Sequence, residues 1–156
     1  MDDCGSSEVG SIPTYRLYKM NILFICKFNK FRSRIAEAYF KSINKDKKIK
    51  IRSAGIFRGT KTNEEIVKIA EEFGIKISLK RKPRPITTKL LRWQDLIIVV
   101  ANDIPEILFE NVSSVKKIIF WKIRDTTLFN EEEIRKIIKE IMKKCDELNE
   151  ELKRRT

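Results

Sequence analysis

One short segment places residue types that could act on phosphate close together in the chain. Cys26 ends the apolar run 22–26, and it is followed six positions later by Arg32 and then by Ser33. The apolar run predicts a buried strand, and apolar residues at helical spacing in 33–43 predict a helix directly after the loop. Free N–H groups and the positive dipole end of a helix N-terminus attract anions and favour a thiolate. The loop therefore indicates a nucleophilic thiol beside a bound anion.

The chemistry expected from this arrangement is attack of the Cys26 sulfur on phosphorus. The guanidinium fork of Arg32 can bind two phosphate oxygens, and Ser33 can donate a hydrogen bond to the thiolate. Displacement of an alcohol or phenol would leave a cysteinyl-phosphate. The chain contains no histidine, so a carboxylic acid from another loop must protonate the leaving oxygen. A lone cysteine is more often a small core residue, but the Cys-x5-Arg-Ser spacing favours the functional interpretation.

The loop between the predicted strand and helix supplies the expected substrate-binding groups. Its backbone amides, together with the guanidinium, would hold the phosphate oxygens in the transition state. Asn29 is a residue type that tolerates unusual backbone angles and can brace a tight loop through its side chain. The predicted substrate-binding residues are Lys27, Phe28, Asn29, Lys30, Phe31 and Ser33.

The elements that must position this loop alternate between strands and helices. Hydrophobic patterning predicts strands over 21–26, 48–54, 95–101 and 115–121, and helices over 33–43, 62–74, 87–93, 105–110 and 130–152. This alternation argues for a three-layer α/β/α fold around a parallel sheet, in which ligands bind beyond the carboxyl ends of the strands. We expect residues 20–156 to form a single domain and residues 1–19 to form a flexible tail.

Composition limits the class of protein further. The 156 residues carry a formal charge of +12, and the segment 76–92 holds basic residues without any acid, so an anionic partner is expected. Three widely spaced cysteines argue against a disulfide framework or a zinc site, and we expect no metal or cofactor. No apolar run is long enough to span a membrane, and no secretory segment is evident, so a cytoplasmic location is the default expectation.

Residues 21–40 resemble the opening of the low-molecular-weight protein tyrosine phosphatases. The phosphate loop of that family has the form Cys-x-Gly-Asn-x-Cys-Arg-Ser, followed by an Ala-Glu-Ala element that residues 36–38 match. Residues 53–55 match the Ser-Ala-Gly of the family, and the order of elements agrees from Met20 onward. The resemblance implies a four-stranded parallel sheet of order 2-1-3-4, with helices on both sides. It also implies a phosphorylated protein or a small aryl phosphate as the substrate.

The same resemblance implies the general acid. The family uses an aspartate on the loop after the last strand, and Asp125 occupies that loop here. Asp125 would protonate the leaving group and later activate water. The chain departs from the family pattern at four positions, namely Phe28 for the loop glycine, Phe31 for the second loop cysteine, Thr126 for proline and Thr127 for an aromatic residue. Phe28, Phe31 and Phe57 could form apolar walls around a phenolic ring.

Three alternatives accompany the phosphatase hypothesis. An arsenate reductase on the same fold would use further cysteines, yet the chain has none between Phe28 and Lys144, and Cys145 lies on the apolar stripe of the last predicted helix. A non-catalytic relative would hold a phosphate or phosphoprotein in a degenerate loop. Nucleic-acid binding through residues 76–92 ranks last, because only charge supports it.

Overall fold

The sheet of the protein is parallel and has four strands. The computed structural model describes residues 19–126 and 130–154, so the predicted tail lies outside the described residues apart from Lys19. The strands run in the order β2-β1-β3-β4, which confirms the predicted topology. The elements are β1 Met20–Cys26, α1 Arg32–Ile43, β2 Ile49–Gly55, α2 Glu64–Glu72, α3 Thr88–Trp93, β3 Leu96–Val100, the 3-10 helix η2 Glu106–Phe109, β4 Ile118–Trp121 and α4 Glu131–Arg154.

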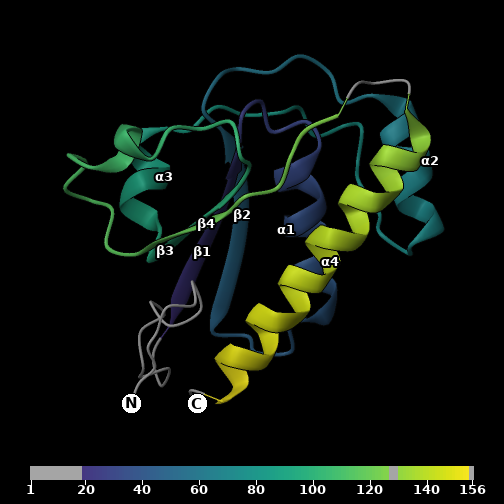
Figure 1. Ribbon diagram of the computed structural model, residues 1–156. Coiled ribbons are helices and arrows are strands. Elements are labelled where there is room, and N and C mark those ends of the chain that lie inside the picture. Colours follow the sequence, from purple (N-terminus) through teal and green to yellow (C-terminus); the bar gives the residue numbers. More distant parts are fainter. Residues whose placement is uncertain (1–18, 127–129, 155–156) are drawn as a thin grey trace.

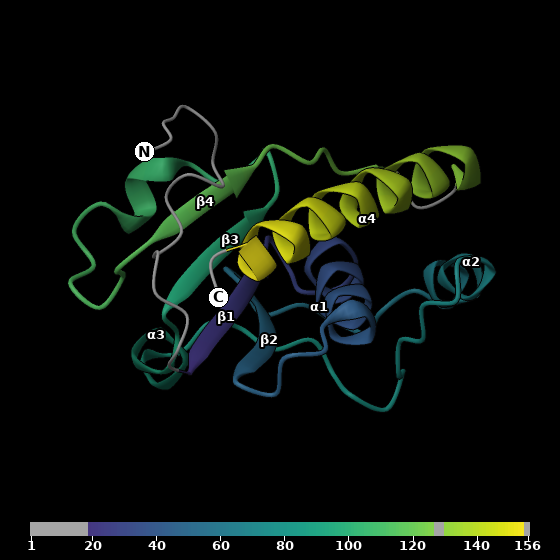
Figure 2. The same cartoon turned by 90° about the horizontal axis from the view of Figure 1, so that it is seen from below.

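Helices cover both faces of the sheet, as the sequence predicts. α1, α2 and α4 lie on one side, and α3 and η2 lie on the other (Figures 1 and 2). Alternate residues of β1 point to the two faces of the sheet. Ile22 and Phe24 pack with α1 and α4, whereas Leu23 and Ile25 pack with α3 and η2. All four side chains are fully buried, which explains why the strand reads as a continuous apolar run.

Asparagine side chains cap the starts of α2 and α4, and α2 begins two residues later than the predicted 62. Asn63 caps α2 by accepting a hydrogen bond from the amide of Glu65, and Gly74 follows the helix with φ 76°. Asn130 accepts a hydrogen bond from the amide of Glu133 at the start of α4. The last strand is shorter than predicted and begins at Ile118. It pairs only with β3, and the first pair of residues between the two strands is Ile97 and Ile118. No described helix is long and apolar enough to cross a membrane.

The carboxyl end of β2 is packed directly against the loop that follows β1. Gly55 pairs with Cys26 in the sheet register, and the amides of Ile56 and Phe57 donate to the carbonyls of Cys26 and Lys27 at 3.0 and 2.9 Å. A Cβ atom at residue 55 would lie 2.7 Å from the carbonyl carbon of Phe28, which is backbone and cannot rotate away. Only glycine therefore lets β2 support the loop at this distance.

We expect Gly55→Ala to destabilise the fold and to displace the loop. Forcing a methyl group against backbone costs about 1–3 kcal/mol in a packed site. Urea unfolding followed by circular dichroism should show this loss, and the alkylation rate of the Cys26 thiol should change. Lys68→Ala, at an exposed position of α2, is the control and should stay within about 0.5 kcal/mol of wild type. Unchanged unfolding and alkylation in Gly55→Ala would contradict this packing argument.

Candidate active site

The thiol of Cys26 lies at the junction between β1 and α1, beside the first turn of the helix. Its Sγ atom is 3.0 Å from Oγ of Ser33, and the cysteine is 3% exposed. Nδ2 of Asn29 donates to the same Ser33 oxygen at 2.8 Å. Because that oxygen already accepts from Asn29, the hydroxyl proton is free to point at the sulfur. Ser33 is thus placed to donate to a thiolate, as the sequence suggests.

Asn29 holds the loop in its tight conformation. It has φ 58° and is the one described residue other than glycine in the left-handed region. Its buried amide donates to Ser33 and to Oγ of Ser53 at 2.9 Å, and its Oδ1 accepts from the amide of Arg84 at 3.1 Å. Phe28 does not have a positive φ, so the absence of glycine at this loop position imposes no backbone strain.

Arg32 is immobilised by three groups from the loops after β3 and β4. Its Nη1 donates to the carbonyl of Ile123 at 3.0 Å and lies 3.1 Å from Oδ1 of Asp103, while Nη2 lies 3.4 Å from Oδ2. Oδ2 of Asp125 is 3.5 Å from Nη2. The arginine is 2% exposed, whereas the Asp125 side chain is 49% exposed. Sequence reasoning missed Asp103, although it follows a buried strand and so stands where ligand-contacting residues are expected.

A cavity of about 240 Å³ joins these groups at the carboxyl edge of the sheet. The structure brings the predicted residues Cys26, Arg32 and Asp125 together on its wall, together with Phe28, Lys30 and Phe31. Asn29 and Ser33 are buried and are not among the lining residues. The remaining lining residues, which sequence reasoning did not find, are Asn63, Ile66, Thr126 and Ile134.

The aromatic residues near the cavity have different surroundings. Phe31 is 6% exposed and belongs to the core on the α1 side, although it also lines the cavity. Phe28 and Phe57 are 39% and 54% exposed, and their ring centroids are 5.9 Å apart. The ammonium of Lys27 lies 5.6 Å from the Phe28 ring, so this predicted residue is near the rim but does not line the cavity. Thr127 lies outside the described residues.

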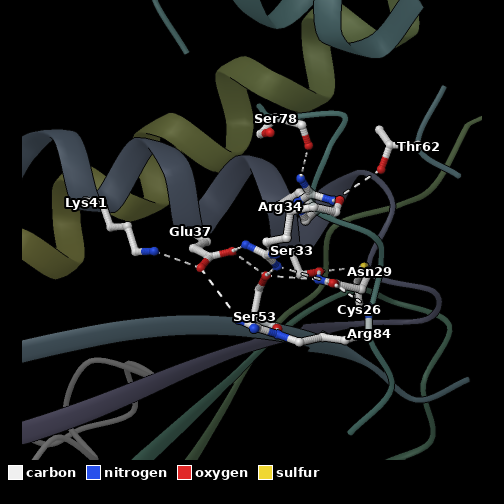
Figure 3. Close-up of polar contacts among 11 residues, drawn as sticks. Cys26, Asn29, Ser33, Arg34, Glu37, Lys41, Ser53, Thr62, Ser78 and Arg84 are labelled. Carbon is white, nitrogen blue, oxygen red and sulfur yellow. Dashed lines mark hydrogen bonds and ion pairs between the residues drawn. The ribbon is translucent and has the colours of Figure 1, made fainter. Parts of the chain in front are cut away.

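A buried carboxylate, Glu37, ties the loop to the rest of the fold (Figure 3). Its Oε1 accepts from the hydroxyl of Ser53 and, at 2.7 Å, from Nη1 of Arg81, and its Oε2 accepts from Lys41 at 2.9 Å. Ser53 also contacts Asn29, so the network reaches the left-handed loop residue. Burial raises the pKa of Glu37, but the Ser53 hydrogen bond and the nearby Arg81 outweigh it and hold that pKa below its usual 4.5.

Few described residues could hold a metal ion. No group of three or more cysteine, aspartate or glutamate side chains with suitable geometry occurs in 19–126 and 130–154. The two described cysteines, Cys26 and Cys145, are both free and buried. The groups that the cavity brings together are a thiol, a guanidinium and a carboxyl group, which can act on a bound anion.

Glu37→Gln should destabilise the protein at neutral pH by about 3 kcal/mol, because it removes a buried carboxylate that pairs with Lys41 and Arg81. The depressed pKa of Glu37 means that its contribution is complete above 4.5 and is lost as the pH falls through the folded-state value. Urea unfolding at pH 7 and at acidic pH should thus show a difference between wild type and variant that shrinks in acid. Glu140→Gln, on the exposed face of α4, is the control. A difference that stays constant in acid would contradict this role.

Comparison with known proteins agrees with the geometry. The family described as "Low molecular weight phosphotyrosine protein phosphatase" matches residues 21–156. The protein-arginine-phosphatase of Bacillus subtilis (strain 168) is 31% identical over 91 residues, which make up 57% of this chain and 61% of that protein. The match therefore spans about three fifths of the length of that relative.

Solved structures of two kinds share the fold. A low molecular weight protein tyrosine phosphatase from T. tengcongensis has a TM-score of 0.73 at 26% identity, with 85% of this chain and 99% of that chain covered. An arsenate reductase from Archaeoglobus fulgidus DSM 4304 has a TM-score of 0.67 at 26% identity, covering 83% of this chain and 98% of that one. With a family match over nearly all of the described residues, the chain belongs to the low molecular weight phosphotyrosine protein phosphatase family.

Proposed function

We propose that the protein hydrolyses phosphorylated side chains of proteins through a cysteinyl-phosphate on Cys26. The observation that carries the proposal is the presence of Cys26, Arg32 and Asp125 around one cavity. Cys26 ends β1, Arg32 begins α1, and Asp125 lies in the loop after β4. They supply a nucleophile, an anion clamp and a proton donor, which are the three groups that phosphoryl transfer to sulfur requires.

Binding of the phosphoryl group uses cations and dipoles that are already in place. The first N–H groups of α1 have no partner within the helix, and the Phe31 cap position makes no side-chain hydrogen bond with them. Arg32 is held at the cavity wall by Asp103 and the Ile123 carbonyl. The N–H groups and the guanidinium then share the charge on the phosphate oxygens, most strongly in the transition state.

The reaction proceeds in two steps. The Cys26 sulfur forms a bond to phosphorus while the bond to the leaving oxygen breaks, and Asp125 transfers its proton to that oxygen. In the second step the Asp125 carboxylate takes a proton from water, whose oxygen attacks phosphorus and releases the thiolate and inorganic phosphate. The Ser33 hydroxyl, 3.0 Å from the sulfur, stabilises the thiolate before the first step and after the second.

Substitutions of the three groups should have different signatures with para-nitrophenyl phosphate. Cys26→Ser should abolish turnover, and Arg32→Lys should lower kcat/KM by roughly 10²–10³-fold because the bidentate clamp is lost. Asp125→Asn should lower kcat by about 10²–10⁴-fold, with the largest loss for the poorest leaving groups. Asp46→Asn, in the turn before β2, serves as the control for Asp125→Asn. Turnover that survives Cys26→Ser would overturn the cysteinyl-phosphate.

An aryl phosphate, as in phosphotyrosine, is the leaving group that the rim of the cavity supports best. Phe28 lines the cavity, and the ring of Phe57 lies beside the ring of Phe28. Both rings are partly exposed. Offset or edge contacts with such rings contribute about 0.5–1.5 kcal/mol beyond apolar burial. Phenols are also better leaving groups than alkyl alcohols, so they require less assistance from the general acid.

Phosphoarginine is the second candidate substrate. The match to a protein-arginine-phosphatase supports it, and so does the exposed Asp125 carboxylate, which is placed to accompany a cationic guanidinium leaving group. Arsenate reduction has less support, although a reductase shares the fold. The described chain offers Cys145 as a second thiol, but it is fully buried in the core, and this burial raises its pKa well above the usual value.

Matched peptides that carry phosphotyrosine or phosphoarginine at the same position should distinguish the substrates. We expect a higher kcat/KM for phosphotyrosine, and Phe57→Ala should reduce it by about 2–10-fold through the loss of one aromatic contact. Turnover of para-nitrophenyl phosphate, a small substrate that has no peptide part, is the reference for each variant. A preference for phosphoarginine that is insensitive to Phe57→Ala would favour the second candidate.

A further inference from the structure

A second cavity, of about 460 Å³, lies beside Glu37 and is lined by residues of α1 and of the segment after α2. Four basic side chains line it, and Glu37 is the single acid among its lining residues. The basic residues come from α1 and from the segment between α2 and α3, and they are Arg34, Lys41, Lys76 and Arg81. One carboxylate cannot neutralise four cations, so the cavity carries an excess of positive charge.

The partners of these cations show where the excess lies. Arg34 is satisfied internally, since it donates to the Ser78 carbonyl at 2.8 Å and to the Arg81 carbonyl at 3.3 Å. Lys76 is exposed, and no described residue forms an ion pair or hydrogen bond with its ammonium. Nε of Arg81 is buried, and no described residue provides an acceptor for it. Buried donors are ordinarily hydrogen-bonded, and within 19–126 and 130–154 this one has no partner.

The environment of Arg34 points in the same direction. Burial, together with the nearby positive charge of Arg81, lowers the pKa of Arg34 to about 10. Glu37 and the Cys26 thiol act in the opposite sense without compensating for these effects. A guanidinium is therefore held among like charges at the wall of this cavity, and an anion in the cavity would relieve that repulsion.

The floor of the cavity is apolar. Ile75 and Ile77 are 3% and 8% exposed, and together with Ala38 they line the space between the basic groups. A site with apolar walls and converging cations fits an organic anion better than a bare inorganic ion. We propose that this cavity binds a small organic polyanion, and that its occupancy slows turnover at the phosphate loop.

Arg81 provides the connection between the two cavities. Its Nη1 donates to Glu37, and its Nη2 donates to Ser53 at 2.9 Å and to Oδ1 of Asn29 at 3.4 Å. An anion beside Arg81 competes with these acceptors for the guanidinium. Asn29 adopts the left-handed backbone angle and donates to the Ser33 hydroxyl. A change in the contacts of Asn29 therefore alters the hydrogen bond between Ser33 and the Cys26 sulfur. This second part of the proposal rests on the proposed hydrolase function.

Citrate is a suitable probe because it is a trivalent organic anion without a phosphoryl group to hydrolyse. In a titration of the full chain followed by ¹H–¹⁵N correlation spectra, citrate should shift the amides of 74–78 and of Lys41 and Ser42 in a saturable manner. Lys76→Glu should weaken this binding at least about tenfold, which corresponds to the loss of one favourable charge contact. Lys80→Glu is the matched control, because it changes the net charge equally but does not line the cavity.

Shifts that are absent from 74–78, or that respond equally to the two variants, would overturn the site. This measurement requires no turnover, so it separates failure of the site from failure of the hydrolase proposal. In steady-state assays citrate should lower kcat at saturating substrate in wild type and in Lys80→Glu, but much less in Lys76→Glu. An anion that merely competes in the phosphate loop raises KM alone. Binding at 74–78 without any effect on kcat would overturn the coupling and leave the site itself supported.

Discussion

The site depends on the side-chain amide of one buried residue in the left-handed region, Asn29. The tight turn between β1 and α1 uses a left-handed backbone angle at this residue, and a residue other than glycine persists there only when its surroundings hold it. Here the surroundings are Ser33, Ser53 and the amide of Arg84, which together use both ends of the Asn29 side chain. The position of the Cys26 sulfur depends on these hydrogen bonds, because Ser33 contacts both Asn29 and the sulfur.

Charge balance constrains the structure behind the loop. Glu37 is almost fully buried and is surrounded by Lys41, Arg81 and Arg84, the last at 4.0 Å. A carboxylate in this position is stabilised by its hydrogen bonds and by the cations, while the cations remain in excess. The same cations that hold Glu37 in its charged form leave an excess of positive charge at the second cavity. The bracing of the loop and the charge of that cavity thus have a common origin.

Much of the fold could be predicted from residue patterns because its two central strands, β1 and β3, are buried on both faces. The apolar runs of β1 and β3 and the apolar stripe of α4 are continuous enough to be recognised in the sequence, and Asn130 marks the start of α4. The Cys26-x5-Arg32-Ser33 spacing located the site because its members are neighbours in the chain. Asp103 and Arg81 were not found, because their contacts join residues 71 and 44 positions apart, and spacing carries no signal for such pairs.

The anchoring of Arg32 has a consequence for binding entropy. A free arginine side chain loses roughly 1.5–2 kcal/mol of rotamer freedom when a ligand immobilises it. In this protein Asp103 and the Ile123 carbonyl have already fixed the guanidinium, so that cost falls on folding instead of on each encounter with substrate. The loops after β3 and β4 thereby lower the entropic cost of binding without contacting the phosphoryl group. This is the general advantage of a preorganised receptor.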